Sequence, residues 1–244
     1  MKKTLCCLSI TGSLATAHAQ TITWQTPQVI SGTFDVSTLG TYFGSWAPFD
    51  AGANALPVNG VSFQGYSDLP GLTASFSGNY GGYNGFGSPG TADANYNALL
   101  QYGQYAYGSG SSTFSWGGMT AGDTYEVQFW VEDARGSTGA RWENLSGGDI
   151  GTTAYGTDTS GPVGYSSPIF SGAASAGYYV VGTFVADSTG SEEILLTPWG
   201  SSPDSQINLF QVRDITSVPE PSTLAFLAVG SLGLLRVGRA RRLA

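Results

Sequence analysis

Carboxylates are the side chains of this sequence best suited to acid–base chemistry. Glu132 and Asp133 are adjacent, and Glu143 and Asp149 follow a short distance along the chain. A glycoside hydrolase needs only two carboxyl groups about 5–9.5 Å apart. Neighbouring side chains of a strand point to opposite faces, so Glu132 or Asp133 would have to pair with Glu143 or Asp149 across a cleft. The alternative interpretation is that these carboxylates neutralise the nearby Arg135 and Arg141.

Histidine, cysteine and lysine chemistry is missing from the central part of the chain. The only histidine is His18, the only cysteines are Cys6 and Cys7, and the only lysines are Lys2 and Lys3. Ser-His-Asp and Cys-His arrangements, and zinc sites built on His or Cys, all require these residue types. We therefore predict no catalytic residues and no enzymatic activity for residues 20–217.

Calcium is the one metal that the composition permits, because it binds carboxylate and carbonyl oxygens. Several aspartates lie in or beside predicted turns, but they form no contiguous calcium-binding loop. Asp also favours turns for reasons of local hydrogen bonding, which is the preferred interpretation here. We predict no cofactor and no metal site, with calcium as the open alternative. The turn aspartates are Asp123, Asp133, Asp187, Asp204 and Asp214.

Aromatic residues in Gly- and Asn-rich loops are the most suggestive candidates for ligand binding. Aromatic rings stack on the flat C–H faces of sugars, and Asn and Tyr can donate hydrogen bonds around the edge. The alternative is that these rings cover the core of a protein with few Leu and Ile residues. The candidates for sugar binding are Tyr80, Tyr83, Phe86, Tyr105 and Trp199, whereas Trp24, Trp46, Trp116 and Trp142 are predicted to lie in the core.

The charge of the central part excludes some partners. Residues 20–217 contain sixteen acidic residues, three arginines and no lysine, which gives a net charge of −13. Nucleic-acid binding requires clustered cations, so it is excluded, and an anionic lipid surface is disfavoured for the same reason. An uncharged Gly, Ser, Thr, Asn and Tyr surface suits contact with neutral sugars or other matrix polymers.

Alternation of period two predicts that these side chains are positioned by β-strands. Tyr125, Val127, Phe129 and Val131 alternate with residues 126, 128, 130 and 132, which indicates a half-buried strand. Asp93 is placed to cap one short helix over 94–102. Further strands are predicted at 60–64, 72–77, 113–116, 140–145, 178–186, 193–197 and 206–214, with Ile207, Leu209 and Gln211 on one face of the last. The fold class is therefore all-β, an antiparallel β-sandwich, specifically a jelly roll.

The two ends of the chain read as targeting segments. Met1-Lys2-Lys3 followed by a moderately apolar run and the small residues Ala17-His18-Ala19 predict a secretory signal peptide over residues 1–19. At the other end, residues 222–235 carry no charge. As a helix they span roughly 21 Å, against a hydrocarbon core of about 30 Å, so they make a marginal permanent anchor. The residues after this run are basic, which predicts a cytosolic C-terminus and a body outside.

The C-terminal features together resemble the PEP-CTERM sorting signal of bacterial exported proteins. They are Val218-Pro219-Glu220-Pro221, the short apolar helix, and the basic end with Arg236, Arg239, Arg241 and Arg242, within residues 218–244. The resemblance implies export through the Sec machinery of a Gram-negative bacterium that makes extracellular polysaccharide. It also implies recognition by a membrane-embedded exosortase, cleavage near the Pro-Glu-Pro, and transfer from the inner membrane to the cell surface. An ordinary tail anchor is the alternative.

The strand patterns of residues 20–217 are similar to those of galactose-binding-type jelly-roll bodies of exported PEP-CTERM proteins. The segments that carry this similarity are 119–135, 179–187 and 207–214. The leading hypothesis is an exported cell-surface or matrix protein with a non-catalytic β-sandwich that binds polysaccharide. A glycoside hydrolase or related carbohydrate-active enzyme, and a purely structural or adhesive matrix component, are the two alternatives.

Overall fold

The structure is a computed structural model in which most of the predicted central domain is described. It covers residues 21–47, 55–64, 66–76, 80–83, 85–106, 108, 110–133, 141–148, 169–171, 177–198 and 204–216. The predicted signal peptide and the predicted sorting segment, with its short helix, lie outside these residues. Within the described parts, no helix combines the length and the apolar character needed to cross a membrane.

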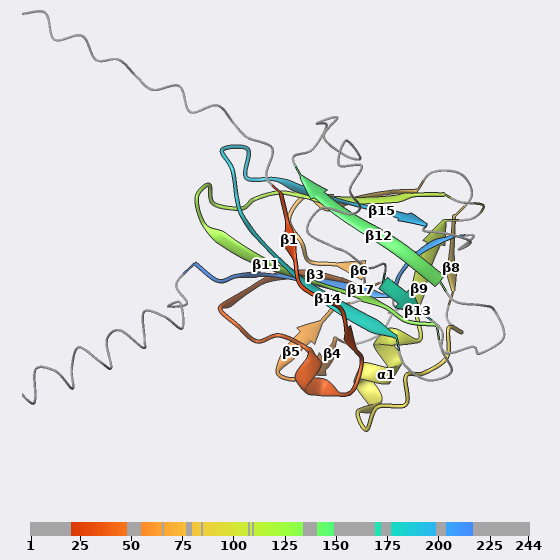
Figure 1. Cartoon of the computed structure of the whole chain (residues 1–244). Helices are drawn as coiled ribbons and strands as arrows, with labels where there is room; N and C mark the ends of the chain where they lie inside the picture. The colour runs from red at the N-terminus through yellow and green to blue at the C-terminus, as the bar shows by residue number, and fades with distance from the viewer. Residues whose placement is uncertain are drawn as a thin grey trace, which may run out of the picture.

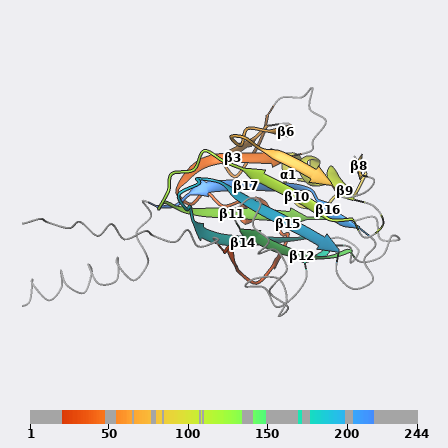
Figure 2. The same ribbon diagram turned by 90° about the horizontal axis from the view of Figure 1, so that it is seen from above.

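Two antiparallel sheets form the main layers (Figure 1). The larger sheet has the order β1-β14-β11-β17-β3-β6, and β2 extends its edge on β14. Its strands are β1 (Thr23–Trp24), β2 (Gln28–Val29), β3 (Thr41–Ala47), β6 (Tyr66–Ser67), β11 (Thr124–Val131), β14 (Tyr178–Val185) and β17 (Leu209–Asp214). The smaller sheet has the order β13-β12-β15-β10-β7, with β7 (Thr73–Phe76), β10 (Ser112–Trp116), β12 (Arg141–Gly148), β13 (Ile169–Ser171) and β15 (Glu192–Pro198). Figure 2 looks onto β10, β15 and β12 with the larger sheet beneath them.

The remaining elements are short. A three-stranded sheet has the order β16-β9-β8, with β8 (Tyr80–Tyr83), β9 (Gly103–Ala106) and β16 (Ser205–Ile207). A hairpin joins β4 (Leu56–Val58) to β5 (Val61–Phe63), and its turn holds Asn59 at a φ of 48°. The helix α1 spans Ala94–Leu100, and the 3-10 turn η1 spans Thr33–Asp35.

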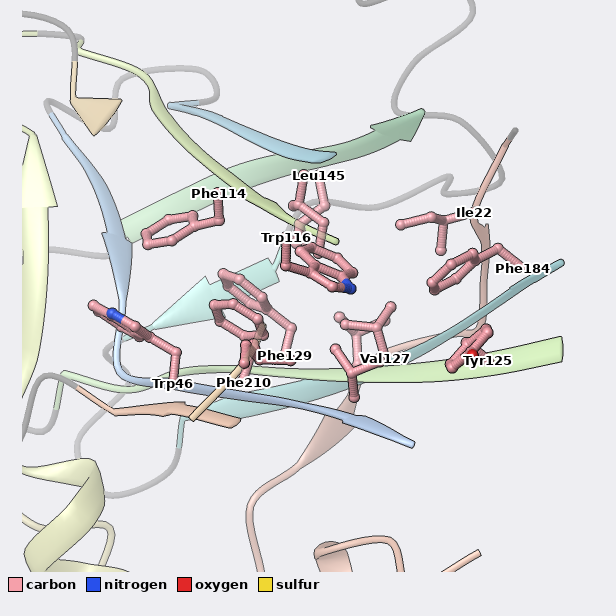
Figure 3. Packing of buried hydrophobic residues seen from close by; sticks show 14 of the residues in the cluster. Ile22, Trp46, Phe114, Trp116, Tyr125, Val127, Phe129, Leu145, Phe184 and Phe210 are labelled. Atoms are coloured by element: carbon pink, nitrogen blue, oxygen red, sulfur yellow. The ribbon is translucent and has the colours of Figure 1, made fainter. Parts of the chain in front are cut away.

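The main core lies between the two sheets and is rich in aromatic rings (Figure 3). Phe210 of β17 stacks on Phe129 with ring centroids 6.2 Å apart, and Phe114 of the smaller sheet meets Phe210 edge-on at 5.7 Å. Trp24, Trp46 and Trp116 are buried in this core, as predicted, and the side chain of Trp142 lies outside the described part. Such rings bury large apolar areas, which compensates for the few Leu and Ile residues.

A third layer covers the outer face of the larger sheet. The segment 30–40, the β4–β5 hairpin and α1 lie on the side opposite β12 and β15 (Figure 1). A second apolar cluster forms there, in which Trp130 and Leu209 of the sheet meet Phe63, Tyr96 and Leu99. The strand predicted at 125–131 is confirmed as β11, but the prediction that only one of its faces is buried is wrong. Glu126, Gln128 and Trp130 are buried because the third layer covers the face that a simple sandwich would leave in water.

The predicted fold class is supported at the level of an all-β antiparallel sandwich with one short helix. Asp93 caps α1 as predicted, because its carboxylate accepts the backbone N–H of Tyr96 at 2.7 Å. The predicted strand 206–214 is interrupted at Asn208 and becomes β16 and β17. This break shifts the alternation by one residue, so Ile207 lies in the main core with Phe210 instead of sharing a face with Leu209.

Candidate functional site

The carboxylates that the glycoside-hydrolase alternative would use do not form an accessible pair among the described residues. Glu132 and Asp133, which follow β11, are 0% and 2% exposed. Glu143 lies in β12 with only its backbone described, and Asp149 and Arg135 lie outside the description. A general acid or base must reach its substrate, and burial removes Glu132 and Asp133 from water and from any large saccharide.

A buried asparagine organises the backbone next to Glu132. The Asn208 Oδ1 accepts the backbone N–H of Glu132 at 2.8 Å, and its Nδ2 donates to the carbonyl oxygens of Leu100 at 2.7 Å and Tyr102 at 3.0 Å. These bonds join the end of β11, the end of α1 and the start of β9 at one point. Because backbone N–H and C=O groups fix which end of the amide is which, the orientation of Asn208 follows from the bonds themselves.

The aromatic candidates divide between the surface and the interior. The β8 strand brings Tyr80 and Tyr83 beside β9, and Tyr105 of β9 has Gly81 and Gln206 as its neighbours across the sheet. Tyr105 is partly exposed, so its ring stays a candidate for sugar binding. Phe86 is fully buried and meets Tyr105 edge-on at 5.9 Å. Neither face of the Phe86 ring is open to a saccharide, so this prediction is wrong and Phe86 takes the core-covering role.

Of the other aromatic residues in and beside these loops, the structure describes the side chain of Tyr102 alone. Tyr102 packs against the second apolar cluster. Trp199 and Tyr107 lie outside the described residues, and the side chains of Tyr80 and Tyr83 are not described. Tyr105 is therefore the one predicted sugar-binding residue that the structure places, with its side chain, at the surface.

An exposed aromatic ring that the sequence analysis missed lies on η1. Phe34 is 92% exposed, although its neighbour Asp35 is 8% exposed. The Asp35 carboxylate accepts the backbone N–H of Ser31 at 2.6 Å, the Ser31 hydroxyl at 2.8 Å and the Gly32 N–H at 2.8 Å. A carboxylate that accepts three bonds fixes a tight turn, so Phe34 is presented on a rigid support. The sequence signal was Ser31 four residues before Asp35, a spacing typical of local side-chain capping.

Two glutamines attach this turn to the larger sheet. Gln128 donates to the carbonyl oxygen of Asp35 and accepts the Ser37 N–H at 2.9 Å, and Gln211 donates to the Ser37 carbonyl at 3.1 Å. Gln211 also donates to the Gln128 Oε1 at 2.9 Å. The segment 31–40 has no strand partner here, so these side chains satisfy its backbone polar groups.

Two residues along the same face of the larger sheet, a buried glutamate lies beside a buried arginine. Glu126 and Arg213 are directly opposite each other in β11 and β17. Burial raises the pKa of the Glu126 carboxyl, while the Ser37 hydrogen bond and the Arg213 charge oppose this rise. Burial also lowers the pKa of Arg213, whose guanidinium donates to the carbonyl oxygens of Leu39 at 2.5 Å and Gly40 at 3.1 Å. These groups hold the segment 31–40 in place and face the interior, so their chemistry is structural.

The turn aspartates accept backbone N–H groups, within their own turns at Asp187 and Asp214 and from a distant segment at Asp204. Asp187 accepts the Thr189 N–H at 2.7 Å, Asp214 accepts the Thr216 N–H at 2.9 Å, and Asp204 accepts the Gly108 N–H at 3.0 Å. In the part of the chain that the structure describes, no three His, Cys, Asp or Glu side chains gather closely enough to hold a metal ion.

Both ends of the described body lie at one end of the sandwich, which we call the exit end. It comprises Leu39–Thr41, Asp123–Thr124, Val185 and Asp214–Thr216. The register places Thr124 opposite Val185, Tyr125 opposite Asp214, and Asp214 opposite Thr41. β1 starts here too, because Thr23 lies opposite Thr183 and the chain runs away from Val185. β8 and β9 lie at the opposite end (Figure 2).

Comparison with known proteins identifies the segment that follows the exit end. Residues 217–242 match the PEP-CTERM protein-sorting motif. The match covers the predicted Val218-Pro219-Glu220-Pro221 and the predicted basic residues, Arg236, Arg239, Arg241 and Arg242. No curated protein matches the chain. The motif supports exosortase-dependent export toward the cell surface, with exosortase as the processing partner.

Proposed function

We propose that this chain is an exported, non-catalytic β-sandwich that binds neutral polysaccharide at the cell surface or in the matrix of a Gram-negative bacterium. The sorting motif at residues 217–242 carries the export part of this proposal, because it begins directly after the folded body at Thr216. Sec-dependent entry by a signal peptide at residues 1–19 and an inner-membrane intermediate complete the route. The body itself is proposed to be a jelly roll of the galactose-binding type.

The binding part of the proposal is supported by exposed rings on a surface with few charged groups. Phe34 is 92% exposed and its backbone is held in the Asp35 turn, so little loop entropy is lost when the ring stacks on a flat ligand. Tyr105 is a second, partly exposed ring. Rigid aromatic anchors with a hydroxyl or amide nearby are typical of binding surfaces. The burial of Glu132 and Asp133 favours a binding module over a glycoside hydrolase.

The export step is tested on the chain in its own host. Intact-mass analysis of the mature protein is expected to show loss of the first 19 residues and of the basic C-terminal end. Deleting the gene for the processing enzyme is expected to retain the full C-terminus in the membrane fraction. Recovery of a mature envelope protein that still carries Arg239–Arg242 would refute the processing route.

The binding step is tested by affinity electrophoresis of residues 20–217 in gels that contain neutral polysaccharides, including the polymer of the host. Phe34→Ser is expected to abolish most of the retardation, because stacking on one aromatic ring contributes about 1–3 kcal/mol in the comparable case of nucleic-acid bases, or roughly 5- to 150-fold in affinity. Val29→Ser is the matched control, since Val29 is also an exposed apolar residue, at 48%, but has no ring. No retardation of the parent protein on any polymer would refute sugar binding and leave the export route standing.

A further inference from the structure

The connection between the folded body and the sorting motif is very short. The Ile215 N–H donates to the Thr124 carbonyl at 2.9 Å, and the Thr124 N–H donates to the Thr216 Oγ1 at 2.8 Å. The Thr216 N–H is held in turn by the Asp214 carboxylate at 2.9 Å. β17 lies between β11 and β3 in the larger sheet, so its end cannot peel away without breaking central strand pairing. The body is thus pinned through Thr216.

The short connection limits where a protein that binds the motif can lie. Pro219 is three residues after Thr216 and Pro221 is five residues after it. Even a fully extended chain covers at most about 3.6 Å per residue, so the Pro-Glu-Pro lies within about 11–18 Å of Thr216. This distance is shorter than the eight-residue strand β11, which is about 23 Å long. A membrane-embedded enzyme with a catalytic pocket of ordinary depth must therefore approach the exit end itself.

We propose that the exit end of the sandwich is a docking surface for the exosortase during processing. This inference rests on the proposed export route. The surface offers exposed apolar side chains, Leu39 at 43% and Val185 at 44%, beside the partly exposed Asp123 and Asp214. Arg213, the cation nearest to it in the described sequence, is buried. Such a surface is repelled by anionic lipid headgroups and fits a protein partner that presents apolar groups and cations.

The position of the two chain ends also sets how the sandwich is oriented relative to the membrane. The start of the described body lies at the exit end with β1, so both membrane-directed segments leave from one side. β8 and β9 lie at the opposite end of the sandwich (Figure 2). In the proposed complex this end, which carries Tyr105 in β9, points away from the membrane. A tethered intermediate can therefore already present Tyr105 to extracellular polymer before it is cleaved.

Val185 of β14 and Val29 of the neighbouring β2 lie level with opposite ends of β14 and provide a matched test. Val185 ends β14 at the exit end, whereas Val29 lies opposite Tyr178 at the other end of the same strand. The two sites are separated by seven residue steps of about 3.3 Å, or about 23 Å, and they are similarly exposed, at 44% and 48%. A photo-crosslinking amino acid is placed at one site or the other in the full chain, in host cells that carry an active-site variant of the exosortase to trap the complex.

The expected result is a covalent adduct that contains the exosortase, identified by mass spectrometry, with at least about threefold more from position 185 than from position 29. A Gly/Ser spacer of about twelve residues, with an r.m.s. length of about 20 Å, is then inserted between Ser217 and Val218. The spacer should reduce the adduct from position 185 about threefold or more, because the effective concentration falls steeply with tether length.

Equal adduct from both positions, more adduct from position 29, or no adduct at either position in cells where the parent chain is processed would overturn the docking surface. These outcomes differ from failure of the proposed function. If the C-terminus of the parent chain is never removed, the export proposal fails, and intact mass reports this result without any crosslink. Circular dichroism of each crosslinkable variant checks that the sandwich is folded.

Discussion

Replacing Asn208 by Asp is the sharpest test of the buried junction between α1, β9 and β11. Aspartate has nearly the same shape, so it can still accept the Glu132 N–H. It cannot donate to the carbonyl oxygens of Leu100 and Tyr102, and an ionised carboxylate would instead face both of them. The protein can avoid this repulsion only by keeping the new side chain protonated. The pKa of this aspartate should therefore rise in the folded state.

The expected loss of stability follows from the cost of protonation. At pH 7, protonating an aspartate with an ordinary pKa near 3.9 costs about 4 kcal/mol, at about 1.36 kcal/mol per unit. One lost hydrogen bond adds about 1 kcal/mol, because the protonated acid can donate only one bond where the amide donated two. We expect N208D to lose about 5 kcal/mol at pH 7 and only about 1–2 kcal/mol at pH 4. The folded state binds the extra proton, so stability falls as pH rises through about 3.9 and levels off above the raised pKa.

The measurement is denaturant unfolding of residues 20–217, followed by fluorescence of the buried tryptophans between pH 4 and pH 7.5. Asn208→Ala should lose about 3–4 kcal/mol at every pH, because it leaves the same backbone groups unsatisfied without adding a charge. Asn95→Asp is the matched control, since its Nδ2 donates to Pro57 at 3.0 Å in a water-exposed setting, and it should change stability by less than about 0.5 kcal/mol. A pH-independent loss for N208D, or a loss equal to that of Asn95→Asp, would refute the hydrogen-bond assignment.

Three further changes test the covering layer and the core. Glu126→Gln should remove a pH dependence of folding. Because burial raises the pKa of the Glu126 carboxyl, the parent protein should lose stability as the pH rises above the ordinary glutamate pKa of about 4.5. Parallel pH profiles of parent and variant in denaturant unfolding would contradict this reasoning. Gly182→Ala should cost about 1–3 kcal/mol in thermal unfolding, because a Cβ at this position would lie 2.4 Å from the Ile22 Cγ2 and 2.7 Å from the Trp24 Cε3. Gly32→Ala is the control and should be nearly neutral, since a Cβ there has no heavy atom within 4 Å. Asp35→Asn should cost about 1–2 kcal/mol and speed amide exchange at Ser31 and Gly32, whose N–H groups share the carboxylate, and unchanged exchange there would show that the turn does not depend on Asp35.

Elements with a strong local signal could be predicted from the sequence. The alternation of 125–131 predicted β11, and Asp93 ahead of an apolar i, i+3, i+4 face predicted α1. The segment 41–47 was missed because Thr-Tyr-Phe-Gly-Ser-Trp-Ala does not alternate, and it became β3 through pairing with distant β17. Pairing of this kind is a property of the whole fold, which local propensity does not report.

Phe34 and the burial of Glu126 were missed for one shared reason. A polar face on a strand is typical of contact with water, and nothing in 124–131 signals that another segment lies over it. Here the polar side chains of that face meet the backbone of residues 31–40. Ser37 binds Gln128, and Leu39 binds Arg213. The third layer can be inferred from the sequence only after the path of residues 30–40 is known.

The polar face also determines where the covering segment docks. In successive rows, β11 and β17 place Glu126 beside Arg213, Gln128 beside Gln211, and Trp130 beside Leu209. Only the first two rows offer donors and acceptors to the backbone of residues 31–40. In the third row Trp130 packs against Phe63 and Tyr96, and its indole N–H is already taken by the Tyr96 hydroxyl at 2.6 Å. A shift of residues 31–40 along the sheet would bury carbonyl and N–H groups against Trp130, at a cost of about 1–3 kcal/mol for each group. One docked position is therefore favoured, and with it one place on the surface for the ring of Phe34.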